Sequence, residues 1–159
     1  MKAERIILKI LSIFTLLTGL MAVLMSLLFY FDATQIIADQ LPGQLYEFGM
    51  RLSIAEAGGF YRIYGLASGV LQILAGFFGI RFASAHADLE GDAKASRARS
   101  GFWAFIFMAF VLSDALLDTI ISFVREKPGS YDAFTLIMAP LIAFVLFALI
   151  ISRRSRIAA

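Results

Sequence analysis

Two carboxylates inside a long apolar run, Asp114 and Asp118, are the residues of this chain best suited to do chemistry. Their four-residue spacing places both side chains on one face of a helix. An Asp near the centre of a membrane helix costs roughly 2.5 to 3.5 kcal/mol, so such residues find partners on other helices and often mark proton or ion pathways. The pair therefore predicts an intramembrane polar site that draws on neighbouring helices.

An arginine at the start of the second apolar run is the predicted ionic partner. At about 1.5 Å per residue, Arg62 and Asp118 fall on the same side of the bilayer centre, across a gap that an arginine side chain can span. We therefore predict an Arg62–Asp118 ion pair. Asp114 lies deeper, where Gln72 and Thr18 project to a similar depth and are expected to hydrogen-bond to it. The predicted intramembrane polar network comprises Arg62, Asp114, Asp118, Gln72, Thr18 and Glu56.

Four apolar runs must position these side chains, and each approaches the roughly 20 residues that a helix needs to cross the hydrocarbon core. Of the 159 residues, 60% are hydrophobic and 16% are charged, and the mean hydropathy is +0.84, which no soluble domain needs. The sequence therefore predicts a single membrane domain, residues 1–159, folded as an all-α integral membrane four-helix bundle. The expected spans are residues 6–30, 60–80, 102–124 and 134–152.

The distribution of Lys and Arg predicts the orientation. Ten of the 14 basic residues fall at the amino end, in the loop between the second and third spans, or in the tail. Because cytoplasmic segments carry the excess of Lys and Arg, both termini are expected to be cytoplasmic. A bacterial inner membrane is the simplest setting for such a multi-pass protein.

The outer loop between the first two spans shows a second pattern. After the Pro42-Gly43 break, apolar residues recur at helical spacing, which predicts a short amphipathic helix lying at the outer membrane surface. We expect this helix to be a lid that shields the outer end of the bundle; a ligand-gating role is the alternative. The apolar residues that define it are Leu45, Phe48, Leu52 and Ala55.

Small residues indicate how the helices pack. In lipid there is no hydrophobic drive between helices, so close backbone contact must supply much of the association. Glycines recur along the second span at spacings of three, four and seven, and Gly19 lies on a similar stripe of the first span. We predict that these two spans form the tightest antiparallel pair; a homodimer seam or a pore lining are the alternatives. The seam residues are Gly58, Gly65, Gly69, Gly76, Gly79 and Gly19.

The residue inventory excludes several chemistries. With no cysteine there is no thiolate metal site, disulfide or iron–sulfur cluster. The single histidine, His86, lies in a charged loop and is expected to be solvated. Glycine-rich phosphate loops and nucleophile motifs are absent, and the basic residues serve topology, so no catalytic residue, metal, cofactor or nucleic-acid partner is expected.

The run E-A-G-G-F-Y-R-I-Y-G, residues 56–65, and the turn E-K-P-G-S, residues 126–130, carry a family resemblance. The chain resembles a widespread uncharacterised family of four-helix bacterial membrane proteins, loosely grouped with the DoxX-like proteins. The resemblance covers residues 31–149 in layout and implies a four-helix bundle without an established activity. Asp114, Asp118 and the longer cytoplasmic loop depart from the family pattern. The motif positions shared with the family are Glu56, Gly58, Gly59 and Gly65.

Three classes of function fit these observations. The expected one is a non-catalytic accessory or interaction subunit, whose partners are the lipid bilayer and either another membrane protein or further copies of this chain. The alternative is a small proton- or solute-coupled transporter or channel that uses Asp114, Asp118 and Arg62 as an oligomer. A membrane enzyme acting on a lipid or quinone is the third class, and it lacks a visible nucleophile–base pair.

Overall fold

The computed structural model describes residues 2–31, 44–47, 50–53, 58–59, 61–84, 92–125 and 130–158. Four long helices dominate this part of the chain, and a π-helical turn leads directly into the second of them. The helical elements are α1 (Lys2–Tyr30), the π-helical turn η2 (Tyr61–Gly65), α3 (Leu66–Ser84), α4 (Asp92–Arg125) and α5 (Ser130–Ala158). Two short strands, β1 (Gln44–Glu47) and β2 (Met50–Ser53), complete it.

Four helices within the described residues are long and apolar enough to cross a membrane. They overlap the four expected spans, which confirms the prediction of a helical protein with four membrane-length segments. The spans are Ala3–Tyr30, Arg62–Ser84, Ala95–Val124 and Ile137–Arg154.

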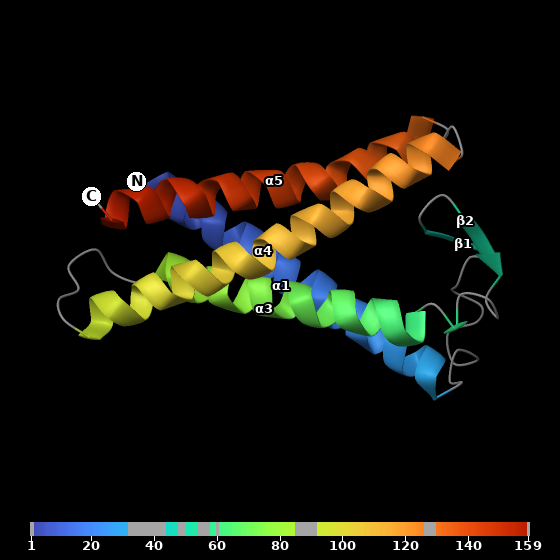
Figure 1. Ribbon diagram of the computed structural model, residues 1–159, viewed down its shortest axis with the longest axis horizontal. Helices are drawn as coiled ribbons and strands as arrows, with labels where there is room; N and C mark the ends of the chain where they lie inside the picture. Colours follow the sequence, from blue (N-terminus) through green and yellow to red (C-terminus); the bar gives the residue numbers. More distant parts are fainter. Residues whose placement is uncertain are drawn as a thin grey trace.

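The helices form a bundle in which neighbours along the chain run antiparallel (Figure 1). Helix α1 packs against α3, α3 against α4 and α4 against α5, while a smaller contact between α5 and α1 closes the arrangement. Both chain ends lie at the same end of the bundle, and the strands lie at the opposite end (Figure 1). Helix α4, which carries the two carboxylates, therefore packs against both α3 and α5.

The contact between α1 and α3 is close because glycines remove side chains from it. A Cβ atom built on Gly19 would lie 2.7 Å from the carbonyl oxygen of Gly69. One built on Gly76 would lie 2.6 Å from the Cβ of Leu16. Real Cβ atoms do not come this close to other atoms, so the two backbones meet where only glycine fits.

The remaining glycines of the predicted seam have different surroundings. Gly79 lies directly against the fully buried Ser12 of α1, with no room for a Cβ. Gly58 is buried, and its Cβ would lie 3.5 Å from Cδ1 of Phe29, an ordinary contact distance. Gly65 is buried at the end of η2. The seam is therefore tightest along α3 itself, from Gly69 to Gly79.

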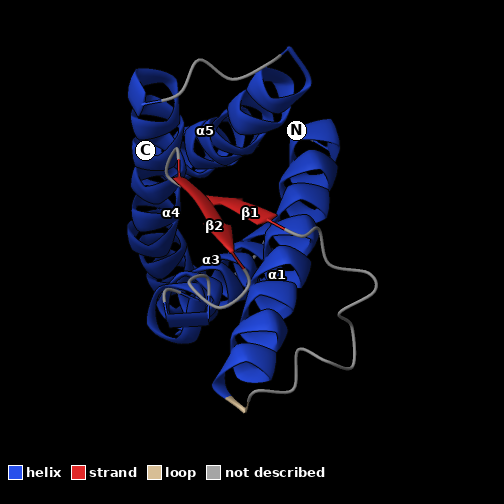
Figure 2. Cartoon of the chain, turned by 90° about the vertical axis from the view of Figure 1, so that its right-hand side faces the viewer, coloured by secondary structure: helices blue, strands red, loops and turns tan. Residues whose placement is uncertain are grey.

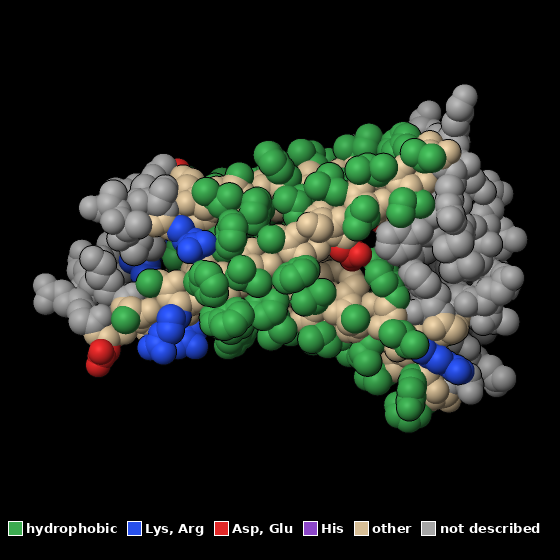
Figure 3. Space-filling view, in the orientation of Figure 1, with side chains coloured by type: hydrophobic (Ala, Val, Ile, Leu, Met, Phe, Trp, Pro, Cys, Tyr) green, Lys and Arg blue, Asp and Glu red, His purple; other side chains and the backbone are tan. Residues whose placement is uncertain are grey.

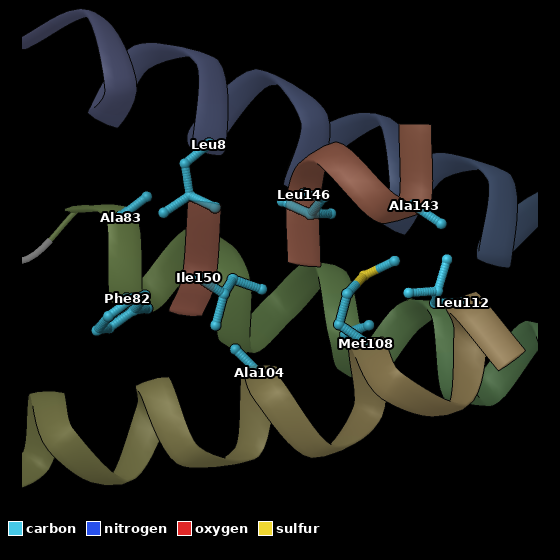
Figure 4. Close-up of a cluster of buried hydrophobic side chains, with 10 residues drawn as sticks. Leu8, Phe82, Ala83, Ala104, Met108, Leu112, Ala143, Leu146 and Ile150 are labelled. Carbon is cyan, nitrogen blue, oxygen red and sulfur yellow. The ribbon is translucent and has the colours of Figure 1, made fainter. Parts of the chain in front are cut away.

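The apolar core lies in the half of the bundle near the chain ends and draws on all four helices (Figure 4). Leu8 of α1, Phe82 of α3, Ala104 of α4 and Ile150 of α5 point toward one another there and are almost fully buried. Larger apolar side chains lie exposed along the helices, and they cover most of the described part of the face shown in Figure 3. An apolar exterior over a small core is what a lipid-embedded bundle requires.

Strands β1 and β2 overturn the expected outer-loop helix over the residues they occupy. They pair antiparallel, with Leu45 opposite Leu52 and Glu47 opposite Met50. In the sequence, two residues separate the strands, and one of them is Gly49; glycine disfavours a helix and is common between the strands of a hairpin. The seven-residue separation of Leu45 and Leu52 is thus compatible with a helix and also with this hairpin, in which the two residues lie opposite each other. The hairpin lies across the end of the bundle away from the termini (Figure 2).

Candidate functional site

Asp114 lies in the second half of α4 and accepts two hydrogen bonds from the neighbouring span. The Tyr64 hydroxyl donates to Oδ1 over 2.5 Å, and the Ser68 hydroxyl donates to Oδ2 over 3.1 Å. Each carboxylate oxygen therefore has a hydroxyl donor from η2 or α3. Inside a bilayer such donors replace the water that a carboxylate would otherwise bind, and this offsets part of the cost of burial.

A polar stripe along one face of the second span supplies these donors. Tyr64, Ser68 and Gln72 follow one another at four-residue intervals, which places them above one another on a helical face. The Gln72 amide donates from Nε2 to Oγ of Ser68 over 3.3 Å, and Ser68 in turn donates to Asp114. Because a hydroxyl that accepts a hydrogen bond becomes a better donor, this chain strengthens the contact with the carboxylate.

The π-helical turn η2 fixes where this stripe begins. It runs from Tyr61 to Gly65 and so contains Tyr64. Within the same turn, Arg62 donates from Nε to the carbonyl oxygen of Phe29 over 2.9 Å. The last carbonyls of a helix lack partners within that helix, and a cation is favourable there, so Arg62 ties the start of the second span to the end of α1. π-helical turns are often found at functional sites.

Asp118 lies one turn from Asp114, toward the hairpin end of the bundle. The hydroxyl of the fully buried Ser122 donates to Oδ1 of Asp118 over 3.4 Å, within α4 itself. Figure 3 shows acidic side-chain atoms at the surface among the apolar side chains. The described acidic residues within the membrane-length segment of α4 are Asp114 and Asp118. The Arg62–Asp118 ion pair stays a prediction.

The other predicted members of the network lie apart from the carboxylates or outside the described residues. The Thr18 hydroxyl donates to the carbonyl oxygen of Thr15 over 2.9 Å, so its hydrogen bond stays within α1. Gln72 reaches Asp114 only through Ser68. Glu56 lies outside the described residues.

Sequence reasoning missed Tyr64 and Ser68, the two direct partners of Asp114. A signal for them was present: each immediately precedes a glycine of the predicted seam, Gly65 or Gly69. Together with Gln72, they form a second stripe beside the glycine stripe. Because the glycine face packs on α1, the adjacent stripe is turned toward the other neighbour of α3, which is α4.

The arrangement supports a restricted chemistry. A carboxylate with two hydroxyl donors can hold a helix contact together or exchange a proton with its surroundings. The described residues contain no group of three or more His, Cys, Asp or Glu side chains that could hold a metal ion. The carboxylate and hydroxyl groups of the site supply hydrogen bonds and groups that can exchange a proton.

The helices and this polar site define a multi-pass membrane protein. No protein family, curated protein or solved structure matches the chain.

Proposed function

We propose that this protein is a small polytopic inner-membrane protein that acts as a non-catalytic accessory or interaction subunit. The observation that carries the proposal is the pair of hydroxyl donors on Asp114. Both donors come from one neighbouring span, and each carboxylate oxygen has one of them. A carboxylate held in this way fixes the position of α4 against α3, which is a structural role.

The surface of the bundle supports the same proposal. Large apolar side chains lie exposed along all four helices, for example Phe14, Phe77, Phe110 and Phe144. Apolar side chains can face either lipid or the helices of another membrane protein. A second membrane protein or further copies of this chain can therefore replace lipid on this surface with little loss of free energy. The proposed orientation places both termini and the basic ends of the helices in the cytoplasm.

The test is purification from native membranes in mild detergent, followed by mass identification of whatever stays bound. An accessory subunit brings one companion in constant ratio, and the companion is retained by Asp114→Asn, which keeps the shape of the side chain. Asp92→Asn, a change at an exposed position of the same helix, is the matched control. Recovery of this chain without any companion from native membranes contradicts the proposal.

The second candidate is proton- or solute-coupled transport by an oligomer, with Asp114, Asp118 and Arg62 as its polar residues. The observation that favours it is the 2.5 Å hydrogen bond between the Tyr64 hydroxyl and Asp114, since two ionisable groups in direct contact can pass a proton. Proton flux into liposomes containing the purified protein is the measurement. Transport requires that Asp114→Asn abolishes the flux while Ser113→Ala, an exposed neighbour, leaves it unchanged.

A further inference from the structure

Three arginines from three helices converge at the end of the bundle that holds the chain termini. Leu8, Ser100 and Ile150 are buried in the core of that end, and each has an arginine three residues farther toward the end. A three-residue step returns to the same face of a helix. The arginines therefore share the inward-facing sides of α1, α4 and α5, and they are Arg5, Arg97 and Arg153.

The charges of these side chains act on one another. Arg97 is repelled by Arg5, and Arg153 is repelled by both Arg97 and Arg5. Glu4 is the carboxylate that attracts Arg153. Among the described residues that these electrostatic interactions involve, three guanidinium groups face one carboxylate, so this group of side chains carries a net positive charge and favours an added anion.

Aromatic rings lie against one arginine of this group, Arg153, and against its neighbour Arg154. The guanidinium carbon of Arg153 lies 5.4 Å from the centroid of the Phe82 ring, which is fully buried. The neighbouring Arg154 lies 4.9 Å from the centroid of Phe105 and 5.7 Å from that of Phe102. These contacts hold the cations against the bundle and reduce their freedom to extend into water.

The position of the group along the helices indicates the source of the anion. The membrane-length segments begin at Ala3 and Ala95 and end at Arg154, so the arginines lie within two residues of the ends of these segments. Basic side chains at the ends of membrane helices are placed to meet lipid headgroups. Phe102, beside Arg154, is exposed on the outside of the bundle and faces the region where acyl chains lie. A ligand that approaches from the side thus meets apolar surface below the cations, as a lipid does.

We propose that Arg5, Arg97 and Arg153 bind the phosphate of an anionic phospholipid headgroup at this end of the bundle. Guanidinium groups match phosphate oxygens with paired, charge-assisted hydrogen bonds. Basic pockets between membrane helices bind such headgroups. A zwitterionic headgroup fits less well, because its quaternary ammonium group would bring a further cation to the three arginines.

The test is competition between phosphatidylglycerol and phosphatidylcholine of matched acyl chains, presented in equal amounts in detergent micelles and read by native mass spectrometry. The informative variant is R97Q/R153Q. The control is R81Q/R99Q, which removes the same charge from exposed positions at the same end of the bundle. Size-exclusion chromatography and circular dichroism verify that each variant is folded.

We expect the wild type and R81Q/R99Q to retain phosphatidylglycerol in preference, and R97Q/R153Q to lose at least about tenfold of that preference. An equal loss in both variants would overturn the proposal, because it would show diffuse surface charge. Inorganic phosphate that displaces the lipid at similar concentration would overturn the lipid assignment. If R97Q/R153Q does not fold, the wild-type protein is measured in about 0.5 M salt, where exposed charges are screened. The proposal requires that its preference for phosphatidylglycerol over phosphatidylcholine persists there. Loss of that preference overturns the proposal.

Discussion

The hydroxyl of Tyr64 and Oδ1 of Asp114 lie 2.5 Å apart, and this hydrogen bond joins the π-helical turn at the start of the second span to the middle of the third. The two residues are 50 positions apart in the sequence. Water that could replace either partner is scarce in the bilayer core, so this hydrogen bond helps to hold the second span against α4.

Tyr64→Phe is expected to destabilise the bundle by about 1–3 kcal/mol, because it removes a donor from a half-buried carboxylate. The ring itself keeps its packing, so the change isolates the hydroxyl. Unfolding in mixed micelles with increasing denaturing detergent measures the difference. Tyr30→Phe is the control, because Tyr30 is 63% exposed. The stability of this variant should be close to that of the wild type. Equal stability of Tyr64→Phe and the wild type would contradict the role given to this bond.

Two substitutions at Asp114 should show whether stability depends on the hydrogen bonds that the side chain accepts or on how apolar the side chain is. Asp114→Asn keeps an oxygen for Tyr64, and its amide can donate to the Ser68 hydroxyl, so we expect a loss below about 1 kcal/mol. Asp114→Leu leaves both hydroxyls without an acceptor and should cost about 1–3 kcal/mol more than Asn, despite its lower cost of insertion. The same unfolding measurement ranks the two. A Leu variant as stable as the Asn variant would show that the hydroxyls find other acceptors.

The glycine seam makes a prediction of its own. Gly76→Ala must push α1 and α3 apart, since the new Cβ would lie 2.6 Å from Leu16, and overpacking of this kind typically costs about 1–3 kcal/mol. Gly59→Ala is the control, because nothing lies within 4 Å of the position that its Cβ would take. Thermal unfolding in detergent compares the two variants. Similar midpoints for both would mean that the helices adjust without cost.

The sequence was enough to predict the helices and the glycines at the close contact between α1 and α3, because both depend on local composition and spacing. The four membrane-length segments follow from hydropathy alone. The partners of Asp114 did not follow, since Tyr64 and Ser68 become its donors only once the rotation of α3 against α4 is known. The hairpin was missed for a different reason: Leu45 and Leu52 satisfy a helical period and a cross-strand pair equally well.

The Arg62–Asp118 pair can be tested by a double-mutant cycle with Arg62→Gln and Asp118→Asn. Arg62→Gln alone should cost about 1–3 kcal/mol, since it removes the charged donor to the Phe29 carbonyl. Asp118→Asn alone keeps an acceptor for Ser122 and isolates the effect of the charge. If the two charges are paired, the double variant loses less than the sum of the single losses, by more than the roughly 0.5 kcal/mol within which independent sites add. Additive losses would show that Arg62 acts on the end of α1 alone. Pairing would instead make Arg62 the residue that joins α1, α3 and α4 at one point, because the same side chain would then hold the Phe29 carbonyl and the Asp118 carboxylate.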